Sequence, residues 1–134
     1  MAGGNMSTIC IATFRAVNGL AFGAPSSTLT ATHGPPDEAL TNYTGELELR
    51  YDDSIYRFFA DRFVEATFPD THQFVVDGVS ILTMLEWLAG ADDCVDKARF
   101  RISPQRGIAY DYRFPDNGSV TVFEDGRWDT LLTG

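Results

Sequence analysis

The sequence predicts an α+β fold in which two short helices pack on a mostly antiparallel meander sheet. Short apolar and β-branched runs recur along the chain, each followed by a turn signal, as is typical of antiparallel strands. One segment of helical character interrupts these runs in each half of the chain. Because the order of helix and then meander occurs twice, the sequence leaves open a tandem helix-plus-meander repeat.

The first half begins with an apolar run at residues 8–17, which predicts a strand, followed by a turn at Asn18-Gly19. A short helix is predicted at residues 25–33, with Ser26 as its N-cap and Gly34 at its C-terminal end.

The first meander follows this helix. Residues 46–51 alternate polar and apolar side chains, which predicts a strand with one face in water. Further strands are predicted at residues 54–59, 62–68 and 73–76. The turns that separate them all contain aspartate, a residue that favours turns.

The second half begins with the helix predicted at residues 80–89, where Leu85 and Leu88 belong to an apolar stripe at helical spacing. Ser80 is the expected N-cap and Gly90 follows the last turn. The remaining strands are predicted at residues 98–102, 108–114, 119–123 and 127–132, the last of them at a sheet edge.

Length and composition favour one compact domain over residues 1–134, with 44% hydrophobic residues. Residues 1–6 are small and polar, so we expect a disordered end or a cloning remnant, with Met6 as the natural start. No window approaches the roughly 18 apolar residues that a membrane span needs. Cys10 and Cys94 are too few for a disulfide framework, and we expect free, buried thiols in a cytoplasmic protein.

The chain is acidic, with 19 Asp and Glu against 10 Lys and Arg and a formal net charge of −9. Six of these nine net negative charges fall within residues 51–100. Because phosphate binding needs a basic surface, this charge argues against a nucleic-acid partner.

Few residues suggest catalysis. His33 and His72 have no carboxylate or cysteine at the spacing of a triad or metal centre, and we expect both to be solvent-exposed turn residues. Cys94 lies among acidic neighbours, which disfavour a thiolate. The acidic pairs lack the spacing of a calcium loop, and the glycines do not form a phosphate loop. The sequence therefore predicts no catalytic residue, no metal and no cofactor.

The first half resembles a known repeat. GLAFG at 19–23, GPPD at 34–37 and ELRYDDSIYRFFADRFVEATF at 48–68 resemble the small α+β repeat shared by the β-lactamase inhibitor protein and barrel-assembly lipoproteins. Residues 78–123 repeat this pattern more faintly. The resemblance concerns the pattern of elements and implies no catalytic motif.

The second half is similar to small cytosolic immunity proteins of bacterial toxin systems, through DGVSILTMLEWLAGADD at 77–93 and ISPQRGIAYDY at 102–112. This similarity implies a single acidic, non-enzymatic domain that binds a cognate toxin and blocks its active site.

We therefore expect an inhibitor whose acidic surface occupies the basic cleft of a toxin. Acidic residues would steer association, and exposed aromatic rings would anchor the complex. The expected partner-binding residues are Asp52, Asp53, Asp61, Asp92, Asp93 and Asp96 for steering, and Trp87, Tyr110 and Trp128 as anchors if exposed.

Two alternatives stay open. A structural or adaptor domain would present an apolar patch without a charge bias. A small cone-like α+β ligand-binding protein or enzyme would need a deep apolar pocket with a few polar groups. The sequence does not fix the oligomeric state, because an edge strand at the end of the chain can pair with a second copy of the chain or with a partner protein.

Overall fold

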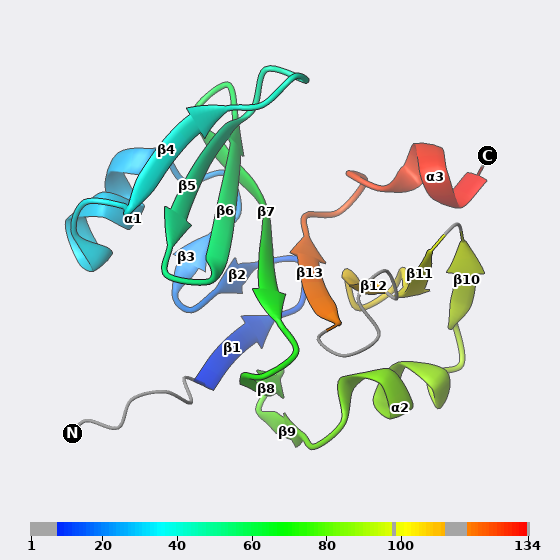
Figure 1. Cartoon of the computed structure of the whole chain (residues 1–134). Helices are drawn as coiled ribbons and strands as arrows, with labels where there is room; N and C mark the ends of the chain where they lie inside the picture. The colour runs from blue at the N-terminus through cyan, green and yellow to red at the C-terminus, as the bar shows by residue number, and fades with distance from the viewer. Residues whose placement is uncertain (1–7, 98, 112–117, 134) are drawn as a thin grey trace.

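The computed structural model describes residues 8–97, 99–111 and 118–133 (Figure 1). Its described part is a mixed α+β structure, made mostly of strands in two sheets together with three short helices. The predictions for residues 1–6, for the end of a strand at 112–114 and for most of the turn after it lie outside the described residues. Among the described residues, no helix is long and apolar enough to cross a membrane.

The helices and strands follow one another along the chain in this order: β1 (Thr8–Ala12), β2 (Ala16–Val17), β3 (Leu20–Ala21), α1 (Ser26–His33), β4 (Glu38–Thr41), β5 (Leu47–Tyr51), β6 (Ser54–Phe59), β7 (Arg62–Pro69), β8 (Gln73–Val76), β9 (Val79–Ile81), α2 (Met84–Ala89), β10 (Val95–Lys97), β11 (Phe100–Ser103), β12 (Ile108–Asp111), β13 (Ser119–Phe123) and α3 (Asp129–Thr133).

The large sheet consists of two meanders joined along one strand of each. Its order is β10-β11-β12-β13-β7-β6-β5-β4, so β7 of the first meander pairs with β13 of the second. Figure 1 shows α1 leading into the first meander and α2 leading into the second. The small sheet has the order β3-β2-β1-β8-β9, in which β1 and β8 run parallel. All other described strand pairs are antiparallel, as predicted.

The main core lies between one face of the large sheet and the small sheet with α1 and α2. Alternate residues of the strands point into it, as the period of two requires. Its buried side chains include Ile9, Ile11 and Val76 from the small sheet, Leu29 from α1, Met84 and Leu88 from α2, and Tyr56, Phe63, Phe68, Val120 and Val122 from the large sheet.

A smaller apolar cluster lies on the opposite face of the large sheet. Ile102, Ala109 and Phe123 form its buried part. Trp128 and Leu131, from the segment that follows β13, pack against it. The C-terminal segment therefore covers one end of a face that the main core leaves open.

Three of the predicted turns form at the predicted residues. Asn18-Gly19, Ala60-Asp61 and Asp77-Gly78 each have positive φ at both residues, between 50° and 86°. Two-residue turns of this kind match the twist of a β-hairpin.

The helix predicted at 25–33 also forms, although Pro25 occupies the N-cap position and the side chain of Ser26 binds Asp61.

Two predicted strands differ in their bounds from the strands of the structure. Residues 8–17 are two strands, because the chain turns at Phe14, whose φ is 59°. The strand predicted at 98–102 begins only at Phe100, as β11 (Phe100–Ser103), and residue 98 lies outside the described residues. The strand predicted at 73–76 forms with the predicted bounds as β8, and it pairs with β1 in the small sheet. Strand β4 was not predicted.

The second helix is shorter than predicted. Val79–Ile81 pair with β8 as strand β9, so the helix begins only at Met84 and Thr83 takes the N-cap position expected for Ser80. The Asp77-Gly78 turn folds the chain back along β8, and the hairpin overrides the helical periodicity of the following residues.

The last predicted strand is a turn followed by helix α3. Residues 127 and 128 are bound to β7 by side-chain contacts, which direct the chain across the sheet and not along its edge. The edge strands of the large sheet are β4 and β10.

Gly107 provides a test of this packing. Its φ is +67°, and a Cβ there would lie 2.7 Å from Phe14 Cε1 and 2.8 Å from the carbonyl oxygen of Phe123. Gly45 has a φ of +85° with no atom within 4 Å of a Cβ. We expect Gly45→Ala to cost about 1 kcal/mol of unfolding free energy through its backbone alone. Gly107→Ala adds overpacking and should cost about 3 kcal/mol in urea denaturation. Equal losses would contradict the described contact.

Candidate functional site

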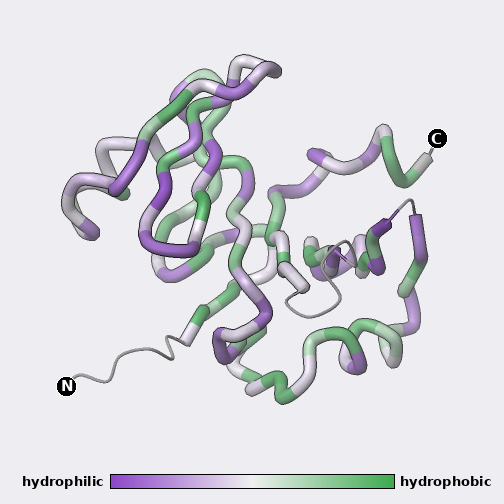
Figure 2. Tube along the Cα trace, viewed as in Figure 1, coloured by the Kyte–Doolittle hydropathy of each residue, from purple (hydrophilic) through white to green (hydrophobic). Residues whose placement is uncertain are grey.

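The open face of the large sheet is the face that the main core does not cover, and it carries a row of alternating charge. The register places Glu48 of β5 opposite Arg57 of β6, and Arg57 opposite Glu65 of β7. On β13, Thr121 lies opposite Thr67, and their hydroxyl oxygens are 3.0 Å apart. Opposite charges on neighbouring strands attract each other directly across a sheet. Figure 2 shows the alternation of hydrophilic and hydrophobic residues along these strands.

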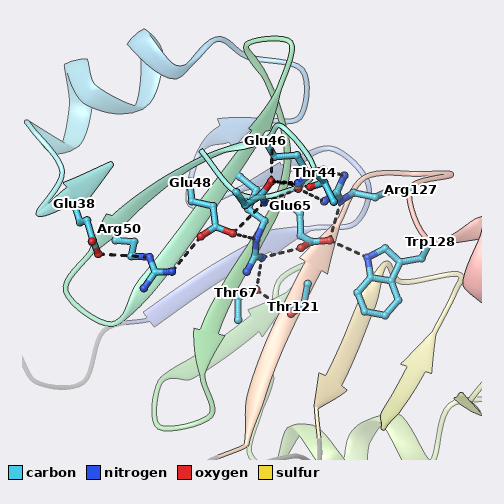
Figure 3. Close-up of polar contacts among 12 residues, drawn as sticks. Glu38, Thr44, Glu46, Glu48, Arg50, Glu65, Thr67, Thr121, Arg127 and Trp128 are labelled. Carbon is cyan, nitrogen blue, oxygen red and sulfur yellow. Dashed lines mark hydrogen bonds and ion pairs between the residues drawn. The ribbon is translucent and has the colours of Figure 1, made fainter. Parts of the chain in front are cut away.

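Arg57 and Arg127 join three carboxylates into one ionic network (Figure 3). Arg57 Nε lies 3.1 Å from Glu48 Oε2, and Arg57 Nη1 lies 2.8 Å from Glu65 Oε2. Arg127 Nε holds the other Glu65 oxygen at 2.8 Å. The same guanidinium binds Glu46 through two nitrogens, at 2.8 and 3.0 Å. Bidentate contacts of this kind fix both position and orientation.

The ionic network, defined as Glu46, Glu48, Arg57, Glu65 and Arg127, is largely removed from water. The three carboxylate side chains are 10–12% exposed, and the two arginine side chains are 18% and 20% exposed. A buried charge that loses its partner is strongly destabilising. The position of the C-terminal segment therefore depends on the network being complete.

Hydrogen bonds favour the ionised form of two carboxylates of the network, those of Glu46 and Glu48. Burial raises the pKa of Glu46 and of Glu48, but hydrogen bonds from Arg127 and Asn42 to Glu46, and from Asn42 and Arg57 to Glu48, outweigh it. The pKa of each carboxyl therefore lies below its ordinary value. Burial alone would lower the pKa of Arg127, but Glu46 and Glu65 raise it above its ordinary value.

Trp128 is positioned by the same carboxylate that binds Arg127. Its Nε1 donates a hydrogen bond of 2.9 Å to Glu65 Oε1. Its ring stacks on Phe123 and meets Phe100 edge-on, with centroids 4.9 Å apart in both pairs. A ring held in this way presents a fixed apolar surface, and Trp128 is half-buried.

Two adjoining hollows lie on the open face around this ring. The larger, of about 630 Å³, is mostly apolar and includes Thr130 and Leu131 of α3 in its lining. The smaller, of about 350 Å³, includes Arg57 and Arg99. Both hollows are lined by Glu65, Phe100 and Trp128.

The arrangement is suited to binding. Each carboxylate of the network is matched by arginine, asparagine or tryptophan donors, which leaves the network without a group poised to transfer a proton. Among the residues that the structure describes, no three His, Cys, Asp or Glu side chains lie together as a metal site. The open face instead offers apolar surface beside arginine and tryptophan.

The structure places the six predicted acidic residues in three separate regions. Asp52 and Asp53 form the β5–β6 turn, and Asp61 lies in the β6–β7 turn at the other end of β6. The remaining three, Asp92, Asp93 and Asp96, lie in and beside the connection from α2 to β10.

Several of these carboxylates have structural partners. Asp61 accepts hydrogen bonds from the backbone and side chain of Ser26. Asp93 accepts hydrogen bonds from Ser103 and from the backbone of Gln105. Asp96 pairs with Arg101. Their role in steering a partner stays a prediction.

The three predicted aromatic anchors lie in different environments. Tyr110 is buried in the main core and its hydroxyl bonds Asp70, so it offers no surface for an anchor. Trp87 is half-buried on α2, with the guanidinium of Arg106 5.8 Å from its ring centroid. The two hollows on the open face, with the residues that line them, are called the open-face site below. Of the three predicted anchors, Trp128 alone lies in it.

Sequence interpretation missed most of the open-face site, in particular Arg57, Glu65, Arg99 and Arg127. A usable signal was present, because Glu48, Arg57 and Glu65 fall opposite one another once the predicted turns are folded. The expectation that Glu46 and Glu48 face water was wrong, since arginines cover them.

The thiols and the histidines were predicted correctly in part. Cys10 and Cys94 are free, but Cys10 is exposed and not buried. His33 is exposed as expected, whereas most of the His72 side chain is buried.

Comparison with known proteins finds no matching family, no matching curated protein and no matching solved structure. The function of this chain therefore has to be inferred from its own side chains.

Removing Arg127 tests the structural role of the network. Arg127→Met keeps much of the side-chain length but leaves Glu46 and Glu65 without their shared partner, so we expect a loss of about 3 kcal/mol in unfolding free energy. Arg62 serves as the control, because its side chain is exposed and makes a surface ion pair, with Nη2 3.9 Å from Glu124 Oε1. Arg62→Met should cost less than about 1 kcal/mol. Similar losses for the two variants in urea denaturation would contradict a special role for Arg127.

The lowered pKa values of Glu46 and Glu48 predict a dependence of stability on acid. A carboxyl whose pKa is lower in the folded state stabilises the fold fully above its unfolded pKa, which is near 4.5 here, and loses this contribution as the pH falls through the folded value. We expect Glu48→Gln to flatten the fall in melting temperature below about pH 4.5. Exposed Glu86 gives the matched control, Glu86→Gln. An unchanged acid profile for Glu48→Gln would refute this linkage.

Proposed function

We propose that this chain is a non-enzymatic protein-binding module and that it binds its partner through the open face of the large sheet. The observation that carries this proposal is the pair of adjoining hollows around Trp128, bounded by aromatic rings and arginines. Arginine and tryptophan contribute most strongly to binding energy at protein interfaces. Because Trp128 and Arg57 are already held by Glu65, binding has to order few side chains.

The net charge of −9 supports a basic partner. The acidic residues at the β5–β6 turn, at the β6–β7 turn and near β10 lie apart, so they do not form one acidic patch. Long-range attraction depends on the summed charge and needs no single patch. In this proposal the acids accelerate association, and the open face supplies the anchoring contacts.

The finer proposal is that binding inhibits the partner, as an immunity protein inhibits its toxin. The two meanders, joined at β7 and β13, form a continuous eight-stranded sheet, which is wide enough to cover an active-site cleft. We infer that they are the two units of a tandem helix-plus-meander repeat, in line with the resemblance of the first half to such a repeat. The proposed target is a bacterial toxin with a basic cleft, and the proposed compartment is the cytoplasm, where free thiols such as Cys10 and Cys94 persist.

A steric block tests the proposed face. Thr130 is exposed and lines the larger hollow, so Thr130→Arg should fill part of it without disturbing the core. Thr28 is an exposed threonine on α1, and Thr28→Arg is the matched control for the added charge. Tagged wild-type protein and both variants are used to capture partners from lysate of the source cells, and the captured protein is then purified and titrated.

We expect one basic protein that binds wild type and Thr28→Arg alike, binds Thr130→Arg at least about tenfold more weakly, and loses its own activity when bound. Equal affinity for Thr130→Arg would show that the open face is not the binding surface. A partner that keeps its activity in the complex would leave the binding proposal intact and refute inhibition. Capture of the same proteins by all three baits, with none of them basic, would refute both.

A further inference from the structure

Strand β9 is an edge strand of the small sheet, and it lies at the lower margin of the molecule in Figure 1. Its inner side pairs with β8 across the two-residue turn at Asp77-Gly78, so Val76 and Val79 close the hairpin. Backbone hydrogen bonds alternate between the two sides of an antiparallel strand. The N–H and C=O of Ser80 therefore point away from β8, where they have no hydrogen-bond partner among the described residues.

The β9 edge lacks the features that normally keep sheet edges from pairing with another chain. Charged side chains and proline are the commonest of these features. Strand β4 carries Glu38, β10 carries Asp96 and Lys97, and β3 has only two residues. Residues 78–83, which form the β9 edge, have the sequence Gly-Val-Ser-Ile-Leu-Thr and contain neither a charge nor a proline. Among the edges of the two described sheets, this one is therefore the most open to pairing.

Two large apolar side chains of the β9 edge lie in water. Leu82 is 97% exposed and Val79 is 59% exposed. Single exposed apolar residues are common on protein surfaces. Here two of them accompany free backbone groups on one short stretch. The edge thus offers both hydrogen bonds and apolar surface to an added strand.

The sequence of the β9 edge is complementary to a second copy of itself. In an antiparallel pair with its two-fold axis at Ser80, the two Ser80 residues exchange both of their outward backbone hydrogen bonds. Val79 then lies opposite Ile81 of the other copy, which makes a β-branched apolar pair on one face. On the other face Leu82 lies opposite Gly78 of the other copy, which leaves room for the larger side chain.

The charges near the two ends of the β9 edge are also complementary. Arg15 and Arg106 lie near its first end, because each lines a hollow together with Asp77. Neither guanidinium makes an ion pair in the described part of the chain. Glu86, exposed in the first turn of α2, lies beyond the second end. Antiparallel pairing brings the first end of one copy beside the second end of the other, so unlike charges approach each other.

We propose that two copies of this chain pair antiparallel along β9, so that their two small sheets become one continuous sheet. An interface of so few residues is small, and small interfaces are typical of weak complexes. The open-face site lies on the face of the large sheet that the main core does not cover, so each copy keeps it free. The pairing therefore does not depend on the proposed function.

Sedimentation equilibrium of the full chain tests the pairing. The measurement is made under reducing conditions, because Cys10 is an exposed thiol, and at about 0.15 M salt, which screens the net charge beyond about 8 Å. We expect a reversible dimer with a Kd of about 100 μM or tighter. A chain that stays monomeric at about 1 mM would refute the proposal.

Two variants locate the interface. Ser80→Pro removes the outward N–H but keeps the bonds to β8, because an edge strand tolerates proline where the N–H faces water. Leu82→Lys keeps the backbone intact and places a charge on the edge. Each should weaken dimerisation at least about tenfold, and Tyr43→Lys, at a fully exposed residue between β4 and β5, should dimerise like wild type. Wild-type dimerisation of folded Ser80→Pro and Leu82→Lys would show that the interface lies elsewhere.

Disulfide trapping tests the register in a Cys10→Ser background. Ser80→Cys should form a disulfide between copies on oxidation, because the Cα atoms of a hydrogen-bonded antiparallel pair are about 5.5 Å apart. Leu82→Cys is the control with an equally accessible thiol. In this register the two copies of residue 82 are four positions out of line, about 14 Å along the strands, so they should not be joined. Equal trapping at both positions would refute the two-fold pairing at Ser80.

A strand from the binding partner is the competing occupant of this edge. The protein captured in the preceding experiment is therefore also titrated with Ser80→Pro. A monomeric chain whose Ser80→Pro variant binds that protein at least about tenfold more weakly would assign the edge to the partner and refute pairing between copies. Loss of dimerisation in Ser80→Pro with unchanged partner binding would support two separate surfaces.

Discussion

The carboxylate of Glu65 is the contact on which the open face depends. It lies on β7, the strand that joins the first meander to the second, and it accepts hydrogen bonds from Arg57, Arg127 and Trp128. Arg127 and Trp128 come from a segment more than 60 residues further along the chain. The place of α3, the orientation of the Trp128 ring and both hollows beside it all follow from this one carboxylate.

The two faces of the large sheet are held together by different interactions. The core face is apolar and supplies the hydrophobic stabilisation of the fold. The open face removes charges from water, which costs free energy that the ion pairs recover only in good geometry. An ionic network of this kind contributes more to selecting one strand register than to the free energy of unfolding. A one-residue slip of β6 would turn Arg57 toward the core, and the same slip of β7 would turn Glu65 there, so the charges fix the register that the meander alone leaves weaker.

Local signals explain what the sequence could predict. The strand at Ser54–Phe59 has the predicted bounds, because a period of two and an aspartate turn on each side define it within a few residues. The open-face site depends instead on contacts distant in sequence. The alternation around Glu46 and Glu48 is indistinguishable from that of a water-facing strand until Arg127, 81 residues after Glu46, returns to cover it. Because of the same contacts, the C-terminal segment forms a helix where an edge strand was predicted. The local propensities of its residues do not indicate these contacts.

The satisfied polar groups of the ionic network decide what the open face can select. On the open face the donors and acceptors of the ionic network already match one another, so a partner gains little by offering it further hydrogen bonds. Such a partner has to contribute shape and apolar surface against Trp128 and Phe100.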